Sequence, residues 1–204
     1  MLPSPESLLP PGYRVSRTTV AVEQLTLDFF RVANPNELSD SLDAESFGED
    51  ERFPYWAELW PSSLALARLL ARRGLPPGSE ALELGCGMGL VGVTAAVLGA
   101  RVTFTDFEAD ALAFAAANHA LNLGALGSTM QVDWRAPPEG LTAPLVLASD
   151  VLYERRFLEP FLATLRRVLG PGGTALVAEP GRRIAEGTVE RLEAEGFGRD
   201  LHLE

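Results

Sequence analysis

Residues 80–106, EALELGCGMGLVGVTAAVLGARVTFTD, decide the fold of this chain. A short apolar run at 81–84 is typical of a buried strand, and glycines follow it at the alternate positions 85, 87 and 89. Small and apolar residues from 90 to 98 predict a tightly packed helix, after which a second apolar run ends at Asp106. Glycines permit close approach of a ligand to the backbone, and the helix turns its free N–H groups toward the loop. The stretch therefore predicts a strand, loop, helix and strand built around a nucleotide-type cofactor site.

Two cofactor classes fit this glycine loop, and the place where the first glycine leaves the strand separates them. Read from position 87, the loop matches G-x-G-x-x-G, with Asp106 near the offset of a ribose-binding acid in a dinucleotide fold. In such a site the first glycine follows the strand directly, which here is Gly85, and the third glycine then falls on Leu90. An alternating G-x-G-x-G from Gly85, with Glu83 two residues earlier, fits better. This motif, E-L-G-C-G-M-G, resembles motif I of the class I, seven-strand S-adenosylmethionine-dependent methyltransferases.

Composition limits the class of protein and its partners. The chain has 204 residues, 47% of them hydrophobic, and a net charge of -11, which argues against nucleic acid and favours a basic partner. Cys86 is the single cysteine, so no intramolecular disulfide can form. The N-terminus does not resemble a signal peptide, and the most apolar stretch is too short to span a bilayer. We expect a soluble, cytoplasmic protein that binds no membrane.

Strand and helix patterns alternate along most of the chain. Residues 14–33 predict a β-hairpin, and the acidic segment 34–52 predicts a loop. A helix capped by Ser62 or Ser63 is expected to run to Arg73. Strands are then expected at 80–84, 101–105, 129–132, 145–149 and 174–179, and helices at 90–98, 107–121, 155–169 and 183–195. This pattern predicts an α/β, Rossmann-like, doubly wound, mostly parallel sheet at 53–204, preceded by an N-terminal extension at 1–52.

Polar residues stand at the ends of the expected strands, where the ligands of such sheets bind. The first strand leads to the glycine loop and the second ends at Asp106. The third ends at Asp133 and Trp134, and the fourth at Ser149 and Asp150. Asp106 is expected to hold two ribose hydroxyls, Asp133 or its backbone neighbours to meet an adenine amino group, and Trp134 either to stack on the ring or to pack in the core.

The resemblance extends beyond the glycine loop to three further segments. L-A-S-D-V-L-Y-E at 147–154 resembles the D-x-x-Y signature of a branch of class I methyltransferases that contains many protein lysine methyltransferases. L-W-P-S-S-L-A-L-A-R-L-L at 59–70 resembles the tryptophan-led helix of that branch, and V-D-W at 132–134 resembles its Asp-Trp pair. The resemblance implies S-adenosyl-L-methionine as cofactor and a protein side-chain nitrogen, with lysine favoured, as methyl acceptor.

The same resemblance implies roles for particular residues. The acceptor would face Asp150 and Tyr153, which we take as the candidate catalytic residues. The cofactor would be bound by Trp60, Glu83, Gly85, Gly87, Gly89, Asp106, Asp133, Trp134 and Ser149. No metal site is expected, because the two histidines are isolated. A small-molecule N- or O-methyltransferase and a non-catalytic cofactor-binding module remain alternatives.

Other residues are expected to have structural roles, and the end of the chain departs from the family pattern. Cys86 is expected to pack in the loop, Asn118 and Asn122 to face solvent or cap their helix, and Arg182 to be a solvated helix end. Tyr55 either shapes the acceptor entrance or packs in the core. After a helix ending near residue 196 only F-G-R-D-L-H-L-E remains, enough for one strand. The family's C-terminal hairpin is therefore shortened or lacks its seventh strand, and the oligomeric state stays open.

Overall fold

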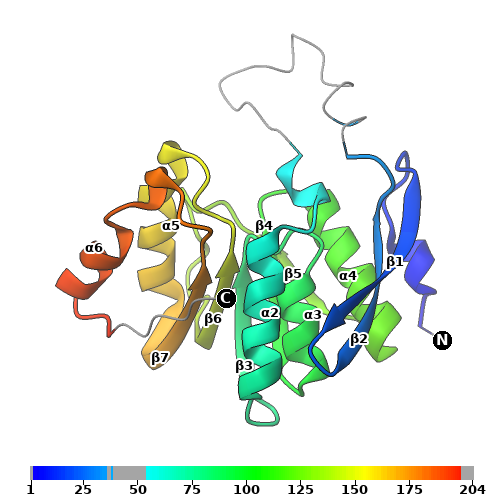
Figure 1. The fold of residues 1–204 in the computed structure, drawn as a ribbon, viewed down its shortest axis with the longest axis horizontal. Coiled ribbons are helices and arrows are strands. Elements are labelled where there is room, and N and C mark those ends of the chain that lie inside the picture. The colour runs from blue at the N-terminus through cyan, green and yellow to red at the C-terminus, as the bar shows by residue number, and fades with distance from the viewer. Residues whose placement is uncertain (1, 36–37, 39–53, 199–204) are drawn as a thin grey trace.

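A parallel sheet of five strands forms the centre of the structure, a computed structural model that describes residues 2–35, 38 and 54–198. The strands are β3 (Glu80–Leu84), β4 (Arg101–Asp106), β5 (Ser128–Gln131), β6 (Ala143–Ser149) and β7 (Leu169–Ala178). They lie in the order β5-β4-β3-β6-β7, and every neighbouring pair is parallel (Figure 1). The chain reverses its direction of winding between β3 and β6, so the carboxyl end of β3 is the switch point at which such sheets bind ligands.

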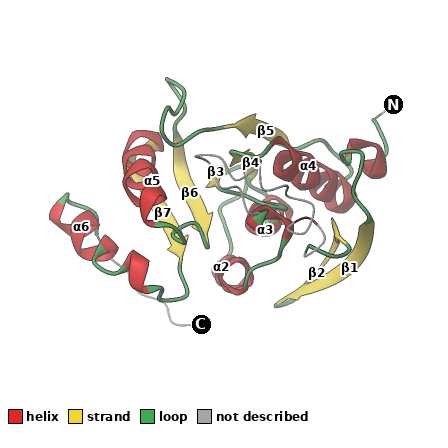
Figure 2. Ribbon diagram, turned by 90° about the horizontal axis from the view of Figure 1, so that it is seen from above, coloured by secondary structure: helices red, strands yellow, loops and turns green. Residues whose placement is uncertain are grey.

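Helices cover both faces of this sheet, as Figure 2 shows from above. On one face lie α2 (Pro61–Arg73), α3 (Leu90–Val97) and α4 (Ala109–Leu123). On the other lies α5 (Arg155–Val168), with α6 (Thr188–Ala194) further out. The doubly wound, parallel α/β fold expected from the sequence is confirmed. There are also three short 3-10 helices: η1 (Pro5–Leu8) near the start of the chain, η2 (Tyr55–Ala57) before α2, and η3 (Arg183–Ala185) before α6.

The N-terminal hairpin is also confirmed, and it packs on α4 by an arrangement that the sequence did not reveal. Strands β1 (Val15–Val22) and β2 (Leu25–Val32) are antiparallel and form a separate sheet. Asn118 of α4 accepts the N–H of Phe30 at 2.7 Å and donates to its carbonyl at 3.1 Å. Asn122, one turn later, makes the same pair of bonds with Asp28. The expectation that both asparagines face solvent or cap the helix is wrong, because they pair with the edge of β2.

Several element boundaries differ from expectation, and two of the differences concern helices. Helix α4 begins at Ala109 instead of 107, since the Asp106 carboxylate accepts the N–H of Glu108 and holds a turn there. The helix expected at 183–195 is divided into η3 and α6 at Gly187, whose φ is 80°. The acidic segment 34–52 lies mostly outside the described residues, as does most of the segment 197–204, where one strand is expected. Within the described part of the chain, no helix is long and apolar enough to cross a membrane.

The start of α2 corrects a further expectation. Neither Ser62 nor Ser63 caps the helix; the cap position is Trp60, whose side chain makes no capping bond, and Pro61 follows it. The N–H of Ser62 instead donates to Oδ2 of Asp150 at 3.0 Å. A carboxylate 88 residues away in sequence therefore does the work of a helix cap.

Candidate active site

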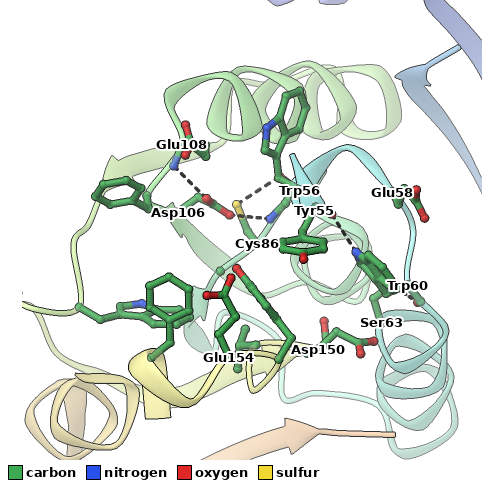
Figure 3. A pocket seen from close by; sticks show the side chains of 18 of the residues that line it. Tyr55, Trp56, Glu58, Trp60, Ser63, Cys86, Asp106, Glu108, Asp150 and Glu154 are labelled. Carbon is green, nitrogen blue, oxygen red and sulfur yellow. Dashed lines mark hydrogen bonds between the residues drawn. The ribbon is translucent and has the colours of Figure 1, made fainter. Parts of the chain in front are cut away.

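A cavity of about 430 Å³ opens at the carboxyl ends of the strands (Figure 3). Its walls come from the glycine loop after β3, the ends of β4 and β6, the loop after β5, the start of α5 and the segment 55–60. Ten of the eleven residues expected at the site line it, all except Glu83: Trp60, Gly85, Gly87, Gly89, Asp106, Asp133, Trp134, Ser149, Asp150 and Tyr153. In Figure 3, Asp106 and Asp150 lie on opposite sides of the cavity.

The glycine loop forms one wall, and its backbone requires glycine. Gly85 has a φ of 65°, and a Cβ there would lie 2.8 Å from Cγ1 of Val151. Gly89, with a φ of 85°, is the cap residue of α3, so the helix opens its free N–H groups toward the loop. Cys86 is buried in this loop as expected of a packing residue, and burial raises the pKa of its thiol.

Glu83 lies behind the loop and is the one expected site residue that does not line the cavity, so its place in the cofactor site stays a prediction. Its side chain is 1% exposed, and Oε2 accepts the N–H of Gly92 in α3 at 3.0 Å. Burial raises the pKa of this carboxyl to about 8. Glu83 therefore ties the first turns of α3 to β3 as a mostly neutral acid at pH 7.

Asp106 presents a fixed carboxylate to the cavity. Oδ2 accepts the N–H of Gly87 at 2.9 Å, and Oδ1 accepts that of Glu108 at 2.9 Å. Burial raises its pKa to about 6, against the backbone N–H groups of Glu108, Gly87 and Phe107 that lower it, so the group is mostly ionised at neutral pH. Each oxygen keeps acceptor capacity for a further donor. Asp106 can thus bind a pair of hydroxyl groups.

Asp133 and Trp134 line the cavity beside Asp106. Asp133 accepts the backbone N–H of Arg135 at 2.9 Å and pairs with its guanidinium, also at 2.9 Å. The Trp134 ring packs edge-on against Phe161 at 5.4 Å, and Thr164 donates to its carbonyl. Trp134 thus packs against the core and also lines the cavity, while its stacking on an adenine ring stays a prediction.

Aromatic rings wall the Asp150 side. Nε1 of Trp60 donates to the carbonyl of Tyr55 at 2.8 Å, and the Tyr55 and Tyr153 rings lie 4.8 Å apart. Phe157 packs against Tyr153 at 5.9 Å. Burial raises the pKa of Tyr153 far above its ordinary value, so its hydroxyl stays protonated at all physiological pH values. Tyr55 therefore lines the cavity, and its role at an acceptor entrance stays a prediction.

Asp150 stands at the end of β6 with a φ of 56°, a conformation uncommon for an aspartate. Its side chain is 4% exposed; Oδ2 accepts the Ser62 N–H, and Oδ1 lies 2.7 Å from Nη1 of Arg182. Arg182 lines the cavity and also contacts Glu179, so the expectation of a solvated helix end is wrong for it. Glu179 is a local partner, three residues away, but no local pattern reveals the pairing with Asp150, which only the fold brings close. Among the described residues, no cluster of metal-ligating side chains occurs.

Comparisons with known proteins identify the family. A family model described as "Lysine methyltransferase" matches residues 46–191. The mouse EEF1A lysine methyltransferase 3 is 30% identical over 165 residues, which are 78% of this chain and 69% of that protein. The zebrafish electron transfer flavoprotein beta subunit lysine methyltransferase is 27% identical over 89% of this chain and 73% of its own.

A solved structure supports the fold independently. The 16S rRNA N2 G1207 methyltransferase of T. Thermophilus, in complex with AdoMet and guanosine, superposes with a TM-score of 0.63 at 17% identity. The match covers 89% of this chain and 46% of that one. At this identity the likeness shows the fold alone, a methyltransferase fold. The family model and the relatives place this chain in the family of S-adenosylmethionine-dependent lysine methyltransferases.

Proposed function

We propose that the protein binds S-adenosyl-L-methionine at the Asp106 side of the cavity and transfers its methyl group to a lysine side chain of another protein at the Asp150 side. The observation that carries this proposal is the single cavity shared by the glycine loop with Asp106 and by Asp150 with Tyr153. Cofactor and acceptor then meet in one space. The protein lysine as acceptor is supported by the relatives, which are named as protein lysine methyltransferases.

The residues at the Asp106 side fit an adenosyl group by their chemistry. A buried carboxylate with spare acceptor capacity suits two ribose hydroxyls, and the indole of Trp134 suits an adenine ring. The glycine loop, next to the open N-terminus of α3, suits the methionine end with its carboxylate. Trp60, Asp133 and Ser149 complete this wall.

For methyl transfer, the protein has to align the acceptor nitrogen with the methyl group and keep water out of the site. When bound, the cofactor supplies a methyl group that is already activated on a sulfonium sulfur, so the acceptor nitrogen has to be held in line with the S–CH₃ bond and away from water. A lysine amine of pKa near 10.4 costs about 4 to 5 kcal/mol to deprotonate at pH 7. The Tyr55 and Tyr153 rings narrow the acceptor end and exclude water there. A site that favours the neutral amine therefore lowers the cost of deprotonation and raises the rate of methyl transfer.

Label transfer tests the proposal directly. Tritiated S-adenosylmethionine, the protein and a heat-treated lysate of its source cells are expected to give labelled protein bands, and acid hydrolysis is expected to place the label in methyllysine. Label in small molecules only would favour the small-molecule methyltransferase instead. Tight binding of NADH with none of S-adenosylmethionine would overturn the cofactor assignment.

Two variants separate the ends of the cavity. Asp106→Ala is expected to abolish labelling through loss of cofactor binding, because it removes the carboxylate proposed to hold the ribose. Asp150→Asn is expected to leave the cofactor Kd nearly unchanged while turnover is lost, because Arg182 loses its ionic partner at the acceptor end. Calorimetry with S-adenosylmethionine measures the first quantity, and label transfer measures the second. An equal loss of both in Asp150→Asn would contradict this division of roles.

A further inference from the structure

Asp150 has a buried carboxylate whose two oxygens have different partners. Oδ2 accepts the Ser62 N–H at 3.0 Å and faces the positive end of the α2 dipole. Oδ1 is buried too, but it accepts no hydrogen bond from the described residues. Nη1 of Arg182 lies 2.7 Å from Oδ1, so the two groups are ion-paired without the geometry of a hydrogen bond. The oxygen that faces Arg182 therefore keeps its acceptor capacity.

A carboxylate oxygen with free acceptor capacity at the acceptor end of a methyltransferase would slow the reaction, because it can bind the acceptor lysine as an ammonium ion. An opposite charge within about 4 to 6 Å raises the pKa of an amine by about 1 to 3 units, and each unit makes the neutral amine tenfold rarer near pH 7. A lysine held by Asp150 as an ammonium ion has no free electron pair for the methyl group. The site needs Asp150 for the start of α2, and it also needs Asp150 not to capture the substrate.

Arg182 can keep Asp150 from capturing the substrate while Asp150 still accepts the Ser62 N–H at the start of α2. We infer that Arg182 is a positioning residue for methyl transfer: its guanidinium occupies the Asp150 carboxylate and so keeps the acceptor lysine from binding there as an ammonium ion. This inference rests on the proposed function. The Arg182 side chain is 30% exposed and lines the same cavity as Tyr153, so its charge also acts on the acceptor directly. A cation in that place disfavours a second cation.

Glu179 weakens the effect of the Arg182 charge on the acceptor amine. Both of its oxygens lie 3.4 Å from Nη1 of Arg182, and one of them accepts the Arg182 backbone N–H at 3.0 Å. Burial raises the pKa of Glu179, as does the charge of Asp150, while Arg182 lowers it. The other charged or ionisable residues that line the cavity are Tyr55, Glu58, Cys86, Asp106, Glu108, Asp133, Arg135, Tyr153, Glu154 and Arg156, of which Glu154 and Arg156 pair at 2.6 Å. Arg182 thus pairs with two carboxylates, and removing the charge of Glu179 alone, which leaves Asp150 in place, should strengthen the effect of Arg182 on the acceptor.

The test compares Arg182→Met, which keeps a long apolar stem, with Arg182→Lys, which keeps the positive charge. The rate of label transfer from saturating S-adenosylmethionine into lysate protein is measured from pH 6 to 10. Arg182→Met is expected to move the midpoint of the pH–rate curve up by about one unit, a tenfold loss at neutral pH that is recovered in alkali. Arg182→Lys should keep the wild-type midpoint. Glu179→Gln should move it down, which keeps a prediction of opposite sign even if Arg182→Met does not fold.

A binding measurement gives a second readout that needs no turnover. With S-adenosylhomocysteine present at pH 7, n-butylamine is expected to bind about tenfold more tightly to Arg182→Met than to the wild type, because the free Asp150 oxygen captures the ammonium ion. Equal butylamine affinities, or a rate lowered by the same factor at every pH, would reduce Arg182 to a structural residue and overturn the inference. A wild-type enzyme that labels no protein would instead overturn the proposed function, and the inference with it.

Discussion

Glu83 is an acid placed where water does not reach it, and its role is to hold the first turns of α3 against β3. Its raised pKa of about 8, against an ordinary value of 4.5, means that the folded protein binds a proton that the unfolded chain releases. The contribution to stability is therefore fully present below pH 4.5 and is lost as the pH rises toward and through 8. Glutamine has nearly the same shape as the neutral acid and does not titrate.

The prediction for Glu83→Gln concerns the pH dependence of stability. Between pH 5 and 8 the free energy of unfolding of the wild type is expected to fall relative to that of the variant, with a slope that approaches about 1.4 kcal/mol per pH unit. Urea unfolding of both proteins at pH 5, 6.5 and 8 measures the difference. Parallel curves across this range would mean that Glu83 is ionised in the folded protein.

Gly92 is the partner of Glu83, and here packing overrides helix propensity. A Cβ at this position would collide with Oε2 of Glu83 and with the ring of Phe104. Propensity alone predicts that Gly92→Ala stabilises the helix by about 1 kcal/mol, whereas overpacking costs about 1 to 3 kcal/mol. We expect net destabilisation in urea unfolding. A gain in stability would show that Glu83 and Phe104 move aside without strain.

At the scale of elements, the asparagine pair on α4 explains why the hairpin stays in place. Four residues of helix rise about 6 Å, close to the advance of two residues along a strand. Side chains one turn apart on α4 therefore meet Asp28 and Phe30, alternate residues of β2. Each amide offers one acceptor and one donor, as a neighbouring strand would. The helix thereby satisfies an edge that is otherwise open to pairing with another chain.

Asn118→Ala is expected to destabilise the protein by about 2 to 4 kcal/mol, since it leaves the N–H and carbonyl of Phe30 and the carbonyl of Met88 buried without their partner. Asn122→Ala is the matched control: its bonds are partly exposed, so water replaces them and the cost is about 1 kcal/mol. Urea unfolding gives both values, and amide exchange at Phe30 reports the hairpin. Equal costs would contradict the difference in burial.

The sequence predicted the features that depend on neighbouring residues, but it did not reveal the side-chain contacts between residues far apart in the chain. The glycine loop, the strand ends and the hairpin each depend on neighbours in sequence, and the structure confirms them. The amide of Asn118 and the carboxylate of Asp150 both bond to backbone 88 residues away, so no spacing pattern marks them. Glu83 was placed in the cofactor site by resemblance. Its position in a strand buried on both faces instead turns its side chain into the core under α3.

At the scale of the whole molecule, charge sets how the enzyme meets a protein substrate. The net charge of -11 is spread over 28 acidic and 17 basic residues, and acidic side chains such as Glu58 and Glu154 line the cavity. A field of this sign raises the encounter rate with a basic surface and is screened by salt, with a Debye length of about 10 Å at 0.1 M. The proposed cofactor site is enclosed by the glycine loop and its backbone N–H groups, so we expect salt to affect cofactor binding less.

A change in ionic strength should therefore affect binding of the protein acceptor more than binding of the cofactor. On going from about 20 to 200 mM salt, the KM for a basic protein acceptor is expected to rise about three- to tenfold, because screening weakens long-range attraction while short contacts persist. The Kd for S-adenosylmethionine, measured by calorimetry in the same buffers, serves as the control and should change less than about twofold. The turnover number should stay constant, since the chemical step occurs inside the cavity. A KM for the acceptor that is insensitive to salt would mean that the protein substrate docks through uncharged contacts, and that the acidic surface has no part in recognition.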